Sequence, residues 1–173
     1  MKKLFSILTI SILICLPSMV YAQTGDDPII RIFNKYEEKD GVESVSISPA
    51  LLRMMTRAGG ANDQRTQDLI SKITGLRILT ISDTSSNRGR TNREAFTAEL
   101  RNVVRNHFTE FMSVRNADER VELYVRNAPE NQTNALLLIT TASNSVTVIH
   151  LAGNIDQTLI EAVMSGEIGI TNR

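Results

Sequence analysis

The sequence predicts an α+β domain, a two-layer sandwich in which helices pack on one face of a mixed or mostly antiparallel sheet. Three observations lead to this class. Early amphipathic stretches alternate with short strand-like stretches, a long stretch after Thr91 has apolar residues at helical spacing, and the last third holds four extended runs in succession. Strands joined directly by short turns pair antiparallel, so the last third predicts a C-terminal meander.

Residues 1–22 have the three parts of a secretory signal peptide. Two lysines follow the first residue, a short apolar stretch comes next, and Val-Tyr-Ala forms a small-x-small cleavage site. The apolar stretch is shorter than the roughly 20 residues that a membrane-spanning helix needs. We therefore expect cleavage before Gln23, export to the periplasm or cell envelope, no integral membrane span in the mature chain, and a single domain over residues 23–173.

Cys15 is the only cysteine and lies inside this leader. The mature chain is therefore expected to have no thiol for a disulfide, a nucleophile or a metal ligand. Lipid attachment at Cys15 is disfavoured, because Ile14 precedes it where the lipoprotein peptidase prefers Gly, Ala or Ser.

The charge balance argues against a nucleic-acid partner. The chain has 19 basic and 19 acidic residues, and two of the basic ones, Lys2 and Lys3, lie in the leader. The mature chain is therefore slightly acidic, whereas nucleic-acid binding requires a basic surface that neutralises phosphates.

The first half of the mature chain predicts helices that alternate with strands. Asp27 and Pro28 have the residue types of an N-cap and a first helical position, and apolar residues follow at helical spacing. The expected elements are a helix over 28–39, a strand over 42–48, a helix over 50–58 that Ser48 and Pro49 introduce, a turn or short helix within 62–72, and a central strand over 76–82.

The second half predicts one long helix and then the meander. Residues 83–90 have the composition of a loop, and Thr91 with Glu94 forms a capping box that would start the helix. Its apolar stripe continues through Phe111. The four strands are expected at 111–116, 119–127, 134–142 and 145–153, the second of them with one solvent-facing side, and a last helix at 156–164.

The order of these segments resembles a known family. The stretches FNKYEEKDGVESVSISPALLRMM, GLRILT, LLLI and VIHLAGNID are similar to the domain of unknown function 4252, a group of small exported proteins found mainly in Bacteroidetes. The resemblance extends from about Pro28 to Met164. It implies an envelope location and a small α+β fold, and it supplies no activity, cofactor or catalytic residue.

The two histidines are the first candidates for chemistry. A zinc site needs three or four His, Cys or carboxylate ligands at close range, and no such spacing occurs, so we expect no metal and no cofactor. His107 continues the stripe of the long helix and is expected to pack there. His150 shares a strand face with Val146 and Val148, which favours a position at the sheet edge or under a helix, with a ligand-binding role as the alternative.

Two further sets of residues are candidates for binding. Arg88, Arg90 and Arg93 lie close together in the sequence and could recognise an anion, although a solvated loop is the favoured interpretation. Met54 and Met55 belong to a short helix that is apolar on more than one side. This helix could be a docking surface for a partner, although core packing under the sheet is the favoured interpretation.

The sequence has no GxSxG, SxxK, HExxH or glycine-rich phosphate motif. We therefore expect no enzyme but a binding, sensory or regulatory module whose partner is another envelope protein or a surface ligand, with weak membrane association left open. A carrier of an apolar small molecule or lipid, held between the sheet and the methionine helix, and a glycan or peptidoglycan hydrolase are the alternatives. A deep polar pocket around a converging His, Glu and Arg would contradict the non-catalytic interpretation.

Overall fold

The computed structural model describes residues 27–58, 64–83, 87–126 and 134–164, so the expected leader and Cys15 lie outside the described residues. The described residues form the helices α1 (Pro28–Tyr36), α2 (Pro49–Ala58), α3 (Gln64–Ser71), α4 (Asn87–His107) and α5 (Gln157–Met164), and the strands β1 (Val42–Ile47), β2 (Ile73–Ser82), β3 (Thr109–Arg115), β4 (Glu119–Arg126), β5 (Asn134–Ala142) and β6 (Ser145–Gly153).

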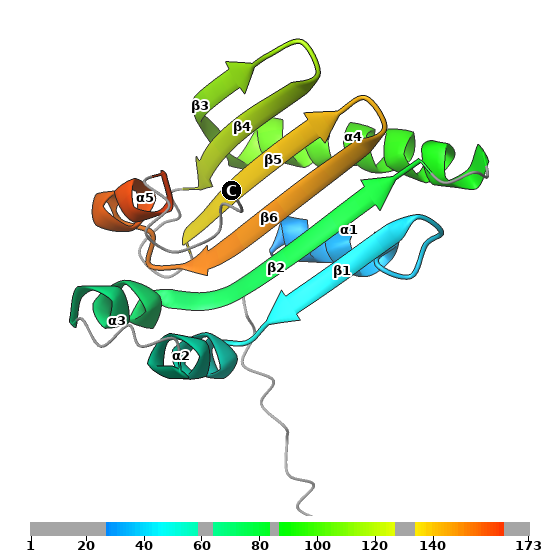
Figure 1. Ribbon diagram of the computed structural model, residues 1–173. Coiled ribbons are helices and arrows are strands. Elements are labelled where there is room, and N and C mark those ends of the chain that lie inside the picture. Colours follow the sequence, from blue (N-terminus) through cyan, green and yellow to red (C-terminus); the bar gives the residue numbers. More distant parts are fainter. Residues whose placement is uncertain (1–26, 59–63, 84–86, 127–133, 165–173) are drawn as a thin grey trace, which may run out of the picture.

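The strands form one open sheet in the order β1-β2-β6-β5-β4-β3, and every neighbouring pair is antiparallel (Figure 1). The last four strands are a meander, as the sequence predicts. β2 joins the N-terminal part to this meander by pairing with β6, with Ile73 opposite Gly153 at one end and Ser82 opposite Ser145 at the other. The α+β class and the C-terminal meander are therefore confirmed.

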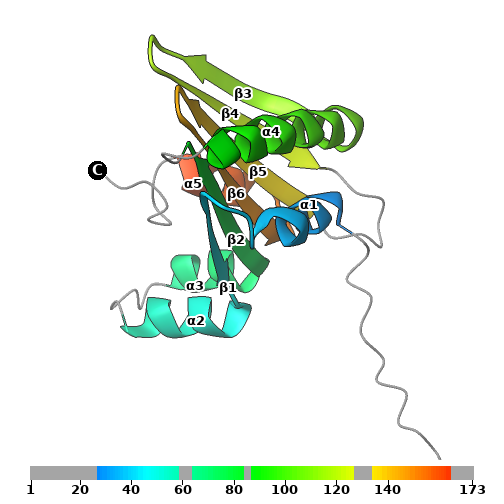
Figure 2. The same cartoon turned by 90° about the vertical axis from the view of Figure 1, so that its right-hand side faces the viewer.

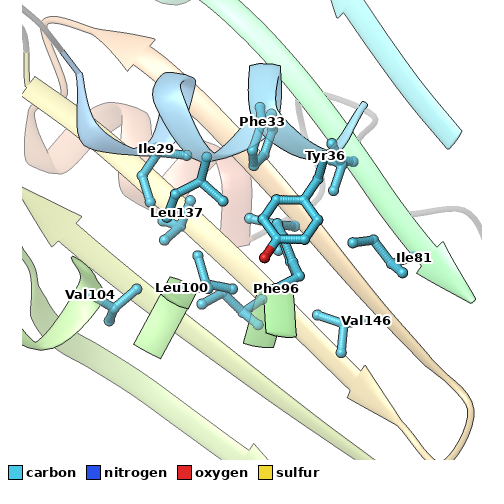
Figure 3. Packing of buried hydrophobic residues seen from close by; sticks show 13 residues of the cluster. Ile29, Phe33, Tyr36, Ile81, Phe96, Leu100, Val104, Leu137 and Val146 are labelled. Carbon is cyan, nitrogen blue, oxygen red and sulfur yellow. The ribbon is translucent and has the colours of Figure 1, made fainter. Parts of the chain in front are cut away.

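Helices α1 and α4 cover one face of the sheet (Figure 2). Phe33 and Tyr36 of α1 meet Phe96 and Leu100 of α4 over the central strands, and the rings of Tyr36 and Phe96 pack edge to face (Figure 3). Because aromatic side chains bury large apolar areas, this first cluster contributes much of the driving force for folding.

The other face has its own apolar cluster at one end of the sheet. Leu69 of α3 and Leu159 of α5 pack there on Leu76, Leu136 and Leu151 of the strands. Helices therefore lie on both faces, whereas the sequence predicts one helical layer. The composition of β2, β5 and β6 explains this. Each of these strands has apolar residues on both of its sides, so both faces of the sheet need a cover.

The helix starts follow local capping chemistry. Asp27 Oδ1 accepts a hydrogen bond from the Ile29 N–H at 2.9 Å, and Asp156 Oδ1 accepts one from the Leu159 N–H at 3.0 Å, so Asp residues cap α1 and α5. Ser48 caps α2 through the Leu51 N–H at 3.3 Å. Pro28 then occupies the first helical position of α1, as expected.

The start of α4 corrects one expectation. The helix begins at Asn87, so residues 87–90 are helical rather than part of a loop, and Thr91 lies inside the helix instead of capping it. The helix ends at His107, and Phe111 lies in β3 with its side chain exposed. β3 begins only two residues after the last residue of α4. Phe111 therefore falls at a helical spacing from the apolar residues of α4 although it lies in a strand.

Two glycines show how tightly β2 and β6 are packed. A Cβ at Gly153, where φ is +154°, would lie 2.1 Å from the carbonyl oxygen of Lys72. That carbonyl is held in place, since it accepts a hydrogen bond from the Asn154 N–H at 2.9 Å. Gly75 differs, because a Cβ there would meet no atom within 4 Å.

Candidate functional site

Helix α2 presents an exposed apolar surface. Leu51, Met54 and Met55 are 43%, 64% and 55% exposed, and their spacing places them on one side of the helix. The helix lies with α3 beyond one end of β1 and β2 (Figures 1 and 2). We call these three residues the α2 apolar face.

The favoured interpretation of Met54 and Met55 as core residues is therefore wrong. Only Leu52 of this apolar run packs against the second cluster. One inward residue anchors the helix, and the remaining apolar side chains face outward. The sequence cannot separate these two sides, because Leu51, Leu52, Met54 and Met55 form one continuous apolar arc of about 160° that no polar residue interrupts.

The three arginines of the expected anion site do not act together. Arg93 is half-buried and forms a two-pronged ion pair with Asp83, from Nε to Oδ1 at 2.7 Å and from Nη2 to Oδ2 at 3.2 Å. Arg88 is exposed and lies 3.6 Å from Asp40, and Arg90 is exposed. Arg93 thus joins α4 to the end of β2, and within the described part of the chain the three arginines form no converging cluster for an anion.

A cleft with a volume of about 570 Å³ lies beside α1, over β1, β2 and the end of β6. We call it the α1 cleft. Its polar lining includes Asp27, Asn34, Arg77 and His150, and Gly75 lies in its wall. Its apolar lining comes from the residues Ile30, Ile47, Pro49, Leu76 and Ala152. A volume of this size is typical of sites for small molecules.

His150 is a fully buried residue of the α1 cleft. Its side chain is 1% exposed, and it lies under α1, with the Phe33 ring at its edge at a centroid distance of 6.4 Å. Of the two positions that the sequence allows, under a helix or at the sheet edge, the first is correct. Nε2 lies 3.3 Å from Asp27 Oδ2 but makes no hydrogen bond of acceptable geometry within the described part of the chain.

Asp27 connects His150 with Arg126. Arg126 Nη2 donates a hydrogen bond to Asp27 Oδ2 at 2.9 Å, and the guanidinium lies 5.7 Å from the centre of the Phe108 ring. Burial alone would raise the pKa of Asp27, but the neighbouring His150, the charge of Arg126 and the Ile29 N–H outweigh burial and lower it to about 2. The carboxylate is therefore charged at every physiological pH.

A second concavity, with a volume of about 460 Å³, lies between α4 and the strands β3, β4 and β5. Here the Tyr124 hydroxyl donates to Glu122 Oε1 at 2.8 Å, and Arg120 Nη2 lies 2.7 Å from the same oxygen. Burial, Glu122 and Glu110 raise the pKa of Tyr124. The side of β4 that was expected to face solvent is thus half-covered by α4, and its charges are paired.

Sequence reasoning named His150 and missed three residues around it. The sequence identifies Asp27 only as a helix cap, and no motif points to Arg126 or Arg77. A signal for Arg77 exists, because an arginine inside the apolar strand LRILTIS must find a polar environment. His107, expected to pack, is exposed at the end of α4.

Across the part of the chain that the structure describes, no three His, Cys, Asp or Glu side chains gather closely enough to hold a metal ion. Within the same residues, no helix is long and apolar enough to cross a membrane.

The family comparison covers most of the fold. The family model described as "Domain of unknown function (DUF4252)" matches residues 36–163. The chain belongs to this family. The match runs from the last residue of α1 to the penultimate residue of α5, so the DUF4252 region contains the whole sheet and leaves most of α1 outside. Comparison with curated proteins and with solved structures gives no match.

Proposed function

We propose that this DUF4252 protein is a non-catalytic, exported envelope protein that binds another protein through the α2 apolar face. The observation that carries the proposal is the exposure of Leu51, Met54 and Met55 on a helix that lies at the end of the sheet. Single exposed apolar residues are common, whereas a contiguous group on one helix marks an interaction surface. Methionine side chains adapt their shape to a partner.

The geometry favours a partner with an apolar groove that accepts one side of a helix. Residues at positions i, i+3 and i+4 are the usual anchors of helix-in-groove recognition. Leu51, Met54 and Met55 have this spacing. Leu52 anchors α2 to the domain from the other side, so α2 can present its outer face without leaving the fold.

The chemistry of the buried cluster supports a non-catalytic role. A general acid or base works best when its pKa lies near the working pH. Asp27, with a pKa of about 2, is a weak base and is not protonated at neutral pH. Its oxygens are engaged by the Ile29 N–H and Arg126, which makes the cluster a structural ion pair rather than the converging acid and base of a hydrolase.

Photo-crosslinking in the host cell tests the docking surface. We expect a benzoylphenylalanine at position 54 to give one discrete cross-linked product with a partner protein. The same probe at the exposed position Ala98 of α4 should give none. The product should disappear when Leu51→Asp and Met55→Asp are added, because charges would then face the apolar groove.

Equal cross-linking at positions 54 and 98, or a product that survives the two Asp substitutions, would contradict the proposed surface. Export is tested separately: mass spectrometry of the protein from the envelope fraction should give an N-terminus at Gln23. A chain that keeps residues 1–22 and stays in the cytosol would contradict this part of the proposal.

A further inference from the structure

The α1 cleft has the properties of a ligand site that is separate from the α2 apolar face. None of Leu51, Met54 and Met55 lines it. It combines a fully buried imidazole, a half-buried guanidinium and an apolar wall in one concavity. We propose that the α1 cleft binds a small organic carboxylate with a short apolar body.

His150 is the first observation. A buried polar atom normally has a hydrogen-bond partner, because burial without one costs about 1–3 kcal/mol. His150 is one of the residues that line the cleft, and its Nε2, 3.3 Å from Asp27 Oδ2, has no hydrogen bond of acceptable geometry among the described residues. A ligand with polar atoms in the cleft would offset this cost.

Arg77 is the second observation. Its Nη1 donates to Asn34 Oδ1 at 2.7 Å, and its Nη2 lies 4.0 Å from Glu37 Oε2, which is too far for a hydrogen bond. A guanidinium has five N–H donors, so most of those on Arg77 are available to a ligand. A carboxylate fits two of them side by side.

The charges around the cleft favour an anion. Asp27 is the carboxylate in the lining, and Arg126 already neutralises it. The lining also holds two arginines, Arg31 and Arg77, and Glu37, which lies 4.0 Å from Arg77, is outside the lining. The apolar wall, with Ile30 of α1 and Pro49 of α2, would cover the ligand's hydrocarbon part. The occupant is thus expected to carry one carboxylate and a few apolar carbons.

A substitution at Gly75 can fill the cleft. Gly75 lies in the wall, its φ is not positive, and a Cβ there meets open space. Gly75→Val should therefore fit the β2 backbone and place two methyl groups in the cavity. The matched control is Arg101→Met, which alters the concavity between α4 and β3–β5 and leaves the α1 cleft unchanged.

In the experiment, tag-free purified protein is titrated with hexanoate and with benzoate. Binding is monitored by calorimetry and by the NMR signals of the imidazole rings. His107 and His150 are the only histidines, and exposed His107 serves as an internal reference. We expect saturable shifts of the His150 signals, unchanged His107 signals, and an affinity about tenfold weaker or more in Arg77→Met. Gly75→Val should abolish binding, and Arg101→Met should bind like the wild type.

Three results would overturn the proposal. The first is unchanged His150 signals and no heat with either acid up to about 10 mM. The second is equal binding of hexanol and benzyl alcohol, which would remove the role of the carboxylate. The third is wild-type affinity in both Arg77→Met and Gly75→Val, whose amide spectra establish that each variant is folded.

Discussion

Asp27 shows how one side chain can serve several roles. It directly precedes α1, caps that helix by accepting a hydrogen bond from the Ile29 N–H, and neutralises Arg126 beside the buried ring of His150. These contacts link residues that lie far apart in the sequence. The low pKa of Asp27 measures how much the fold prefers its charged form.

The pH dependence of Asp27 has a definite sign. Its pKa is 3.8 in the unfolded chain and about 2 in the fold. The stabilisation of about 2 kcal/mol is therefore complete above pH 3.8 and is lost as the pH falls towards 2. We expect Asp27→Asn to lower the unfolding free energy by about this amount at neutral pH, measured by urea denaturation, and the difference from wild type to vanish near pH 2.

Asp156→Asn is the matched control. Asp156 also caps a helix and pairs with a lysine, Lys72, but its side chain is far more exposed. Asn caps helices as well as Asp does, so both substitutions remove mainly the charge. A loss at Asp27 no larger than at Asp156 would show that the buried cluster contributes no special stabilisation.

At the scale of elements, α4 owes its position partly to Arg93. The two-pronged pair with Asp83 joins the second turn of α4 to the residue after β2. Among the described residues, the ion pair of Arg88, in the first turn of α4, is a long and exposed contact with Asp40. The two arginines look alike in the sequence, yet only one of them holds neighbouring elements together.

We expect Arg93→Met to lower the unfolding free energy by about 1–2 kcal/mol, because it removes charge-assisted hydrogen bonds from a half-buried site. Arg88→Met should change it by less than about 0.5 kcal/mol, as is usual for exposed pairs. Thermal denaturation of both variants provides the measurement. Equal effects would mean that the Arg93 pair does not anchor α4.

Local patterns predict most elements of this fold, because each strand and helix carries its own periodicity. The run SVTVIHLAG matches β6 to the residue, and Pro49 marks the start of α2. The start of α4 differs from the prediction, because Thr91 and Glu94 have the residue types of a capping box but lie inside a helix that begins at Asn87.

The candidate site is less predictable for a physical reason. The cluster of Asp27, Arg126 and His150 forms only when α1, β4 and β6 come together, and no local pattern encodes that. The exposure of Met54 depends likewise on where α2 lies relative to the sheet. His150 could be named because a histidine is unusual in an apolar strand.

At the scale of the whole molecule, one sheet separates two apolar clusters. The first lies under α1 and α4, and the second under α3 and α5. Strands β2, β5 and β6 contribute side chains to both, with Leu79 and Leu76 of β2 on opposite faces. We expect the two clusters to unfold together, because neither can lose its strands alone.

Leu159→Ala tests this coupling. Leu159 is fully buried in the second cluster, so its truncation should cost about 2–5 kcal/mol. Tyr36 reports on the first cluster, on the opposite face. The urea midpoint seen by tyrosine fluorescence should fall together with the midpoint seen by circular dichroism. A tyrosine midpoint that does not move would show that the clusters unfold independently.

The pairing of β2 with β6 has a kinetic consequence. Hairpins β3–β4, β4–β5 and β5–β6 join neighbours in the chain and can close within microseconds. The partners Ile73 and Gly153 are separated in the chain by α4 as well as by the meander, so their encounter requires the closure of a long loop. We expect this late step to set the speed of folding, with the free edge of β6 open to wrong pairing until β2 arrives.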